Sequence, residues 1–403
     1  WLEGRSHPAD GSTLQPADLE AGVTCEICHR MVDPVPSTND ESVQTDQLIR
    51  TALTTTLPTD HNGGAMIIID PSDNRRGPFS LGIDFQFHPE NTYQTDLLGR
   101  NQNDYITRSR LCGTCHNVDN PVLSWDASRG QFWPNDNDQP APSFDKGQLF
   151  PIETTFDEWL NSQYAATGIY APQFAGQRLD GIVGACQDCH LPRATGLAAE
   201  EFYNPIFRDC ENTGCLPVHD MVGGNSWVPQ LLLDDRWRLN SLNETQYLTA
   251  TISYARQMLR KAAAMTVTMT TAKNGEKFAT VRVTNHSGHK LPTGYPEGRR
   301  LWLNLKAYNA LGDLIYESGA YDPTNGTLTQ DDDIKVYETI QGLTPELAAL
   351  VGWPAGESFH FVLNNTVIKD NRIPPRGYTQ AAFDHPGLRP IGAAYSDGQY
   401  WDD

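Results

Sequence analysis

The chain has 403 residues, of which 30 are Lys or Arg and 50 are Asp or Glu, so its formal net charge is -20 at pH 7. A charge of this sign repels nucleic acid, and a mean hydropathy of -0.50 without an apolar run of transmembrane length argues against a membrane span. The length predicts two or three domains. The sequence begins at Trp1 without an initiator Met, so we expect a processed form or a fragment, with further sites upstream left open.

Residues 1–243 form the first predicted region, and they show little regular periodicity. Pro, Gly, Asn and Asp interrupt the region throughout, as in residues 133–140, which read WPNDNDQP. Such a sequence predicts loops with few short helices. Loops of this kind bury little aliphatic core of their own, so something other than aliphatic packing is expected to organise the region.

Three copies of the pattern Cys-x-x-Cys-His lie in this region. Their cysteines are Cys25, Cys28, Cys112, Cys115, Cys186 and Cys189, and the histidines that follow are His29, His116 and His190. Each copy supplies two thiols for thioether bonds to a haem and a histidine that binds the iron from the same turn. The pattern therefore predicts three covalently attached haem c groups, wrapped by the loops of a triheme region.

Zinc binding is the alternative for a Cys-x-x-Cys pair. A structural zinc site needs a second Cys or His pair within about 20 residues to complete a tetrahedron. Here successive motifs begin at residues 25, 112 and 186, and a histidine follows each pair directly, which zinc does not require. The spacing favours haem over zinc or redox dithiols.

The two remaining cysteines are Cys210 and Cys215, which lie five positions apart with no histidine behind them. Haem c is attached outside the cytoplasm, and an oxidising compartment favours a disulfide between two such cysteines. Closing so short a loop would stabilise the fold by about 2 kcal/mol. We therefore expect an exported protein, periplasmic or extracellular, with a Cys210–Cys215 disulfide, and free buried thiols are the alternative.

A connecting helix is predicted over residues 244–264. Its apolar side chains recur at spacings of three and four, as expected for one helix face. These are Leu248, Ile252, Ala255, Leu259 and Ala262.

In residues 265–403 apolar and polar side chains alternate with a period of two, which predicts strands. Val267 and Met269 alternate with polar residues, as do Val281 and Val283, and residues 301–308 read as a long strand. Residues 309–313 read as its turn into residues 314–316, and residues 358–363 as another strand. Many strands without intervening helices predict an all-β, sandwich-like C-terminal domain.

Two further segments carry a resemblance to a known family. They are residues 285–300, which read NHSGHKLPTGYPEGRR, and the Gly223-Gly224-Asn225 stretch after His219. Together with the three haem motifs, they make the chain similar to multihaem c-type cytochromes of bacteria and archaea that join a haem-wrapping region to a β-rich C-terminal domain. The haem motifs are highly specific to c-type cytochromes, whereas the GHKLPTG stretch is moderately specific to this group. The resemblance covers most of the chain, although both ends look cut short beside such relatives.

The resemblance implies periplasmic or extracellular electron transfer, and some members of the family polymerise into conductive filaments. It also bears on the axial ligands of the irons. The motif histidines fill three of six axial positions, and eight other histidines remain, which is enough for a second histidine on every haem. Methionine is the alternative distal ligand, and the six Met residues are fewer.

We predict three distal ligands and keep His7 and His61 as reserves. His289 lies beside Gly288, where the backbone can approach a flat ring closely, and similar His-x-x-Pro-Thr-Gly stretches supply ligands in multihaem relatives. His219 lies near the predicted disulfide and a Gly-Gly turn. His88, in the stretch FQFHP, has aromatic neighbours suited to covering a porphyrin.

Two classes of function are compatible with these features. An electron carrier needs several six-coordinate haems close together, whereas a multihaem oxidoreductase needs one haem with an open distal site and acid or base groups beside it. The chain has histidines for every distal site and no variant attachment motif, so we predict an electron-transfer protein rather than an enzyme. A head-to-tail extracellular polymer and a periplasmic monomer are both left open.

The charge is uneven, with a net of -16 over residues 1–264 and -4 over residues 265–403. This favours basic partners, other redox proteins or further copies of the chain. Two acidic stretches, Asp331-Asp332-Asp333 and residues 70–74, are weak candidates for Ca²⁺, with solvated loops as the better interpretation.

Overall fold

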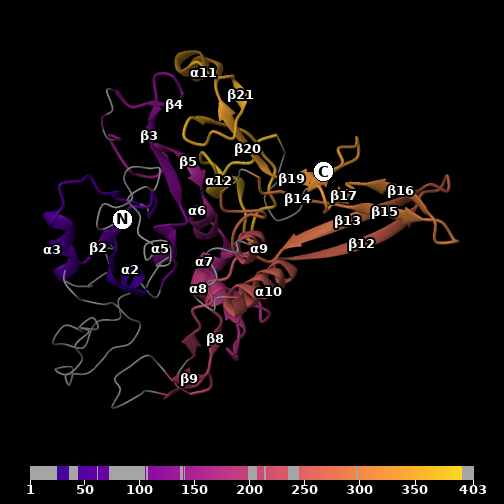
Figure 1. Ribbon diagram of the computed structural model, residues 1–403, viewed down its shortest axis with the longest axis horizontal. Helices are drawn as coiled ribbons and strands as arrows, with labels where there is room; N and C mark the ends of the chain where they lie inside the picture. The colour runs from indigo at the N-terminus through magenta and orange to yellow at the C-terminus, as the bar shows by residue number, and fades with distance from the viewer. Residues whose placement is uncertain are drawn as a thin grey trace. The chain divides into compact units, whose positions relative to one another are not determined.

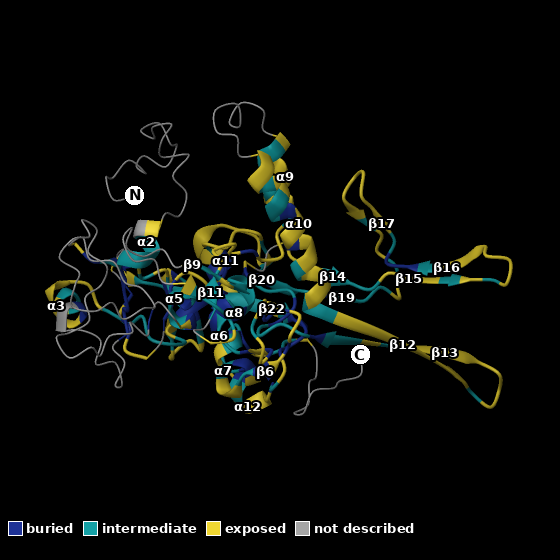
Figure 2. Cartoon of the chain, turned by 90° about the horizontal axis from the view of Figure 1, so that it is seen from below, coloured by how far each residue is buried: buried dark blue, intermediate teal, exposed yellow. Residues whose placement is uncertain are grey.

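The fold is described from a computed structural model, shown as a ribbon in Figure 1 and coloured by burial in Figure 2. The structure describes residues 25–35, 44–60, 62–71, 105, 108–136, 139, 141–197, 207–212, 215–234, 245–295 and 298–392. The chain falls into two compact units. Unit 1 comprises Trp1–Leu57 and Met66–Leu111, and unit 2 comprises Pro58–Ala65 and Cys112–Asp403.

Unit 1 contains short elements held by arginine side chains. They are helix α2 (Cys25–Arg30), strand β1 (Met31–Val32), helix α3 (Gln44–Ala52) and strand β2 (Ile68–Ile69). Strands β1 and β2 pair antiparallel. The Arg30 guanidinium donates to the Asp70 carbonyl at 2.6 Å, and Arg110 pairs with the buried Asp33 carboxylate at 2.7 Å. These contacts fix the turn that carries the first Cys-x-x-Cys-His motif.

Unit 2 begins with a small sheet and several short helices. The helices are α5 (Ser109–Gly113), whose first residues belong to unit 1, α6 (Thr155–Leu160), α7 (Gln163–Thr167) and α8 (Cys186–His190). Strands β3 (Val118–Asp126), β4 (Gln131–Pro134) and β5 (Leu149–Glu153) form a three-stranded sheet in the order β4-β3-β5. Its apolar face packs Leu123, Phe132 and Phe150 against Leu347 of helix α11 (Pro345–Val351).

Three two-stranded ribbons are formed by the segments that precede and follow the third motif in the chain. They are β6 (Ile169–Tyr170) with β7 (Ile182–Val183), β8 (Arg193–Ala194) with β11 (Leu216–Pro217), and β9 (Gly196–Leu197) with β10 (Phe207–Arg208). The predicted disulfide between Cys210 and Cys215 is present, and it closes the loop between β10 and β11.

The predicted connecting helix is confirmed as α10 (Thr245–Ala262), which follows helix α9 (Trp227–Asp234). Its predicted apolar face is buried only in part, because Ile252 and Ala255 are buried while Leu259 is 52% exposed. Met258, which the pattern left out, packs on the apolar cluster beside the third motif.

The region after α10 is built mainly of antiparallel strands. They are β12 (Ala263–Thr271), β13 (Lys277–Asn285), β14 (Leu301–Trp302), β15 (Leu305–Tyr308), β16 (Leu314–Ser318), β17 (Tyr321–Asp322), β18 (Thr327–Leu328), β19 (Val336–Tyr337), β20 (Thr339–Leu343), β21 (Gly356–Glu357) and β22 (Thr366–Asp370). Helix α12 (Gln380–Phe383) follows them. The coarse prediction of a loop-rich, β-rich chain with few helices is thus confirmed. The described strands pair in two- and three-stranded sheets, and this pairing does not by itself bear out the finer prediction of a sandwich.

Two strand predictions need correction. The stretch 301–308 is divided into β14 and β15, because the Asn304 amide side chain bonds the Ser318 and Gly319 carbonyls at 3.0 Å and interrupts the ladder. The stretch 358–363 is a turn rather than a strand, since the Leu363 and Asn364 amides both donate to the His360 carbonyl. Phe359, Phe361 and Val362 of that stretch are exposed, so the alternation of apolar and polar residues reflects no buried face. The predicted turn over 309–313 between β15 and β16 is confirmed.

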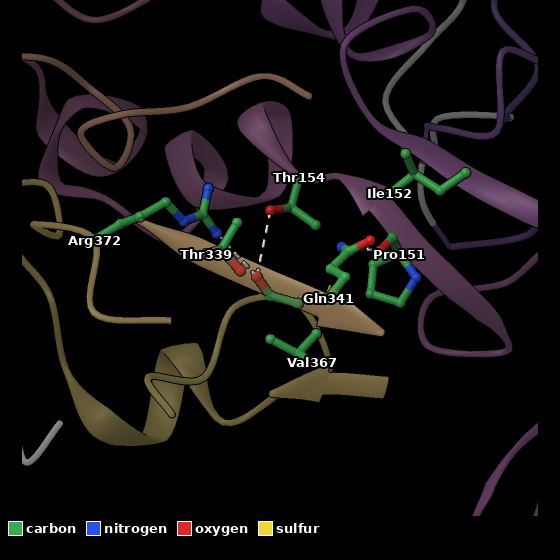
Figure 3. A pocket seen from close by; sticks show the side chains of 8 residues that line it. Pro151, Ile152, Thr154, Thr339, Gln341, Val367 and Arg372 are labelled. Atoms are coloured by element: carbon green, nitrogen blue, oxygen red, sulfur yellow. Dashed lines mark hydrogen bonds between the residues drawn. The ribbon is translucent and has the colours of Figure 1, made fainter. Parts of the chain in front are cut away.

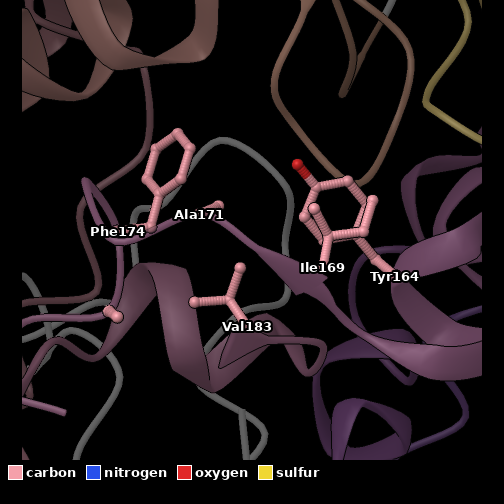
Figure 4. Close-up of a cluster of buried hydrophobic side chains, with 6 residues drawn as sticks. Tyr164, Ile169, Ala171, Phe174 and Val183 are labelled. Atoms are coloured by element: carbon pink, nitrogen blue, oxygen red, sulfur yellow. The ribbon is translucent and has the colours of Figure 1, made fainter. Parts of the chain in front are cut away.

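One buried cluster, drawn in Figure 4, packs against Cys189 of the third motif. Its members come from α7, the β6–β7 ribbon and the loop between those strands, and they are Tyr164, Ile169, Ala171, Phe174, Ala175 and Val183. Cys189 and Trp159 pack against it from outside. The third motif therefore packs, through Cys189, against buried apolar side chains.

The predicted limits 1–243, 244–264 and 265–403 do not coincide with the two compact units. Unit 2 contains residues from both sides of the helix, and long-range hydrogen bonds join them. The Gln341 amide donates to the Pro151 carbonyl at 3.0 Å, and the Asn120 amide to the Val362 carbonyl at 2.7 Å. Residues 112–197 and 286–392 are therefore built into one packed body, because short strands from each complete the core of the other.

Replacing Asn365 by Ala should lower the free energy of unfolding of unit 2 by about 2 kcal/mol. The buried Asn365 amide donates to the Phe132 carbonyl at 3.0 Å, and its oxygen accepts from the Thr344 amide at 2.9 Å. The measurement is urea unfolding. The control is Asn325→Ala in an exposed turn, which should change stability by less than about 0.5 kcal/mol. Equal effects of the two variants would contradict this account of the core.

Candidate functional site

The third Cys-x-x-Cys-His motif forms helix α8, and one of its own residues caps that helix. The Asp188 carboxylate accepts the Gly184 and Ala185 amides at 3.0 Å each. Its other oxygen pairs with Arg178 at 3.0 Å and with Arg193 at 3.1 Å. A carboxylate in the first turn satisfies exposed N–H groups and complements the helix dipole. The turn that presents Cys186, Cys189 and His190 is therefore fixed from within the motif.

The rings of His190 and His289 lie close together and nearly parallel. The two ring centroids are 6.5 Å apart, and the ring planes differ by 20°. Two imidazoles that bind one metal through opposite nitrogens, each about 2 Å from it, have centroids about 6 Å apart. His190 and His289, one of them a motif histidine and the other the leading predicted distal ligand, thus fit the two axial positions of a single haem iron.

Hydrogen bonds fix which nitrogen of each ring is available. His190 Nδ1 lies 2.8 Å from the Val222 carbonyl, and His289 Nδ1 lies 3.0 Å from the Lys290 carbonyl. A carbonyl accepts only from a protonated nitrogen, so each Nε2 keeps its lone pair for a metal. Burial lowers the pKa of both imidazoles, which favours the neutral ligating form.

The loop that carries His289 is held by a cluster of buried charges. We call Glu158, Lys290, Asp370 and Arg372 the buried ion cluster. Glu158 accepts the Lys290 amide at 3.0 Å and pairs with Arg372 at 2.8 Å. The Lys290 ammonium pairs with Asp370 at 2.7 Å, and Arg372 pairs with the same carboxylate at 2.7 Å. All four side chains are at most 5% exposed.

The charges of this cluster balance one another. Burial alone raises the pKa of Glu158 and of Asp370, but the Arg372 and Lys290 cations outweigh it and hold both pKa values below the ordinary range. Thr293 adds a hydrogen bond from its hydroxyl to Glu158 at 2.7 Å. Both carboxylates are therefore ionised at neutral pH, and the backbone on either side of His289 has a fixed path.

A small cavity adjoins the buried ion cluster (Figure 3). Its lining includes Thr154, Gln341 and Arg372, and its volume of about 10 Å³ is near the minimum that one water molecule needs. The Gln341 side-chain oxygen has no protein hydrogen-bond partner there. The cavity is too small for a substrate, and we assign it no role beyond hydration of the cluster.

The second motif contacts the first turn of helix α6. The Phe156 amide donates to the His116 carbonyl at 2.9 Å. Gly113, inside the motif, lies so close to the Phe156 ring that a Cβ would sit 2.6 Å from its Cγ, so only glycine fits there. His116 Nδ1 lies 3.1 Å from the Glu153 carboxylate, and this hydrogen bond raises the pKa of the imidazole. A carboxylate in this position orients a ligating histidine and increases its basicity.

Helix α6 also contacts the third motif and the His289 loop. The Trp159 indole donates to the Gly184 carbonyl at 2.6 Å, just before α8. A Cβ on Gly288 would lie 3.0 Å from the same indole, so Trp159 touches both segments. The rings of Phe156 and Trp159 stack with centroids 5.4 Å apart. His116 is near enough to lower the pKa of both His190 and His289, so the second and third motifs are neighbours.

The first motif lies in unit 1. Cys25 and Cys28 occupy helix α2 with His29 near its end, and burial raises the pKa of the Cys28 thiol. All six motif cysteines are free of disulfides. Burial also raises the pKa of Cys189 to about 12, which is unlike the activated thiolate of a redox dithiol.

The other predicted ligands have different outcomes. His219 is exposed and follows β11, where the Val218 amide bonds the Pro192 carbonyl at 3.0 Å, so the structure places it near the segment after His190. Its role as a ligand stays a prediction. His7, His61 and His88 lie outside the described residues.

Sequence reasoning missed the groups that support the ligands. Glu153 and Glu158 come from a loop-rich stretch, and Asp370 and Arg372 lie more than 200 residues beyond it. The available signal was Lys290, which directly precedes Leu291 and Pro292, because a lysine that becomes buried demands a partner. Nothing in the sequence names that partner.

The Asp331-Asp332-Asp333 candidate for Ca²⁺ receives no support, whereas residues 72–74 of the other candidate lie outside the described residues. Asp331 accepts the Gly319 amide, the Ser318 hydroxyl and the Asp333 amide, so its oxygens serve a turn. Among residues that the structure describes, no group of three His, Cys, Asp or Glu side chains is arranged to hold a metal ion by itself. Within the same residues, no helix is long and apolar enough to cross a membrane.

Comparison with protein-family models, with curated proteins and with solved structures found no match.

Replacing Glu158 by Gln should lower the free energy of unfolding by about 3 kcal/mol, because it leaves buried cations undercompensated. The pKa of the folded-state carboxylates is depressed, so their contribution is complete above the ordinary carboxylate range and is lost as the pH falls below about 4. The variant should accordingly lose less stability than the wild type over that acid range. The measurement is thermal unfolding as a function of pH. The exposed Glu357→Gln is the control, and a parallel acid loss in all three proteins would refute the assignment.

Proposed function

We propose that this chain is a multihaem c-type cytochrome that binds three haem c groups covalently and transfers electrons through them. The observation that carries the proposal is the pair of rings of His190 and His289. The rings are nearly parallel, their centroids are 6.5 Å apart, and each is bonded at Nδ1. His190 directly follows a Cys-x-x-Cys pair. The distance and the tautomers match the two axial ligands of one iron, and the adjacent thiols match the covalent attachment.

Each residue has a defined part in this proposal. Haem c supplies a reversible one-electron couple when it is bound. Cys186 and Cys189 would form the thioether bonds, while His190 and His289 would hold the iron. Val222 and Lys290 keep both imidazoles in the tautomer that ligates. At the second motif His116 would bind the iron, and the Glu153 carboxylate would strengthen the electron donation of its imidazole.

Helix α6 sets the relation between the second and third sites. Its Phe156 contacts the second motif, its Trp159 contacts the third, and the two rings stack. The rigid link keeps the two sites close without help from flexible loops. Short, fixed separations between redox centres are what electron transfer requires, and no substrate pocket is needed.

The expected setting is the periplasm or the outside of the cell. The Cys210–Cys215 disulfide is compatible with an oxidising compartment. The net charge of -20 favours basic redox partners and repels nucleic acid.

Haem content is the first test. The intact mass of the native protein should exceed the polypeptide mass by three haem increments, and a pyridine haemochrome assay should give the c-type spectrum with two thioether bonds per haem. A mass without covalent additions would overturn the proposal. Binding of cyanide or nitrite to the reduced protein at full occupancy would instead favour an oxidoreductase with an open site.

Replacing His289 by Ala should convert one of the three haems from low spin to high spin, because that iron loses an axial ligand. It should also loosen the loop that joins His289 to the buried ion cluster. The matched control is His286→Ala, three residues earlier. There the Tyr164 hydroxyl donates a hydrogen bond to the backbone carbonyl, which the substitution keeps. The measurement is the absorption and electron paramagnetic resonance spectrum of each variant. An entirely low-spin His289→Ala protein would show that another residue is the ligand.

A further inference from the structure

The imidazoles of the second and third sites have different kinds of partner at Nδ1. His116 Nδ1 lies 3.1 Å from the Glu153 carboxylate. His190 Nδ1 and His289 Nδ1 each lie near a backbone carbonyl instead, at 2.8 and 3.0 Å. A carboxylate is a stronger hydrogen-bond acceptor than a neutral carbonyl. The two sites therefore differ in how strongly the protein polarises the rings that would bind the iron.

The Glu153 carboxylate has a fixed position beside the second motif. Its side chain is 5% exposed, and the Thr155 hydroxyl donates at 3.2 Å to the same oxygen that His116 contacts. Glu153 is the last residue of β5, where the antiparallel register pairs it with Val118 of β3, two positions after His116. Strand pairing and the side-chain hydrogen bond thus hold the carboxylate and the ring together.

The surrounding charges do not cancel this difference between the sites. The Glu153 hydrogen bond raises the pKa of the His116 imidazole, and burial and the Arg299 cation oppose this rise without reversing it. Beside His289, the two carboxylates and two cations of the buried ion cluster balance one another. The second site therefore has an electron-donating influence on its ligand that the described side chains around the third site do not match.

Ligand basicity acts on the iron in a known direction. A hydrogen bond from Nδ1 to a carboxylate increases the electron density that the imidazole donates through Nε2. More donation stabilises ferric iron relative to ferrous iron, which lowers the reduction potential of a haem.

We propose that Glu153 is a positioning residue that sets the reduction potential of the second haem below that of the third. Electrons then pass from the second site to the third, where one electron leaves ferrous iron at His116 and reduces ferric iron at His190. This direction of transfer rests on the function proposed above. The contacts of helix α6 with both motifs place donor and acceptor close together.

The test is a spectroelectrochemical titration of the haem-loaded protein and three variants. Glu153→Gln keeps the shape of the side chain and replaces the carboxylate by a neutral amide. Arg299→Gln is the charge control, because it removes one exposed charge near the same ring and leaves the Glu153 hydrogen bond in place. His289→Ala identifies the potential of the third haem, since that haem loses a ligand.

We expect Glu153→Gln to raise one of the three potentials by about tenfold in the equilibrium constant, which is about 59 mV for one electron. In the wild type this potential should lie below the one that His289→Ala alters. Arg299→Gln should shift the same potential downward and by less, because solvent screens an exposed charge.

Four results would overturn the proposal. They are three unchanged potentials in Glu153→Gln, a change in the potential that His289→Ala also alters, an Arg299→Gln shift as large as that of Glu153→Gln, and a third haem with the lowest potential in the wild type. The last result needs no change at Glu153, so it decides even if Glu153→Gln fails to fold. Each of them in a protein with three haems leaves the electron-transfer proposal standing, whereas absence of covalent haem overturns both proposals.

Discussion

The six-residue helix α6 is the constraint on which the candidate site depends. It begins beside the second motif, where Phe156 covers Gly113 and bonds the His116 carbonyl. It ends beside the third motif, where Trp159 bonds the Gly184 carbonyl. Between them Glu158 holds the loop that presents His289. One turn and a half of helix therefore positions three segments that are far apart in sequence.

The charge on Glu158 explains why this arrangement is specific. A buried carboxylate is costly unless cations and donors surround it, and Glu158 is surrounded by Arg372, the Lys290 amide and the Thr293 hydroxyl. An apolar residue in its place would pack without prescribing where the loop of residues 286–294 must lie. The buried ion cluster thus prescribes one position for His289, at some cost in stability. The ligand role proposed for His289 needs such a fixed path more than it needs additional stability, because ligation depends on position.

Local features of the fold could be predicted from the sequence, whereas long-range ones could not. Helix α10 and the two strands β12 and β13 follow from residue periodicity, and the Asn309–Asp313 turn follows from turn chemistry. The stretch 358–363 was predicted as a strand because Phe359 and Phe361 alternate with polar residues, but that alternation has no core beneath it. The motif cysteines and histidines were found because their chemistry is local. Glu158 and Arg372 were not, since a pairing over 214 positions leaves no local pattern.

His289 lies between these two cases. Its glycine and proline neighbours indicated a backbone able to approach a flat group, and the structure brings its ring opposite His190. The reason for that position, the contact of Lys290 with Glu158, is a tertiary one. The account therefore joins a local signal for the ligand to a non-local explanation of how it is held.

A structure of the haem-loaded chain is the most direct measurement of this account. The account predicts an iron between His190 Nε2 and His289 Nε2, about 2 Å from each, with the Glu158 carboxylate still bonded to the Lys290 amide. An iron bound to His190 with its opposite position open, or filled by a residue other than His289, would contradict it.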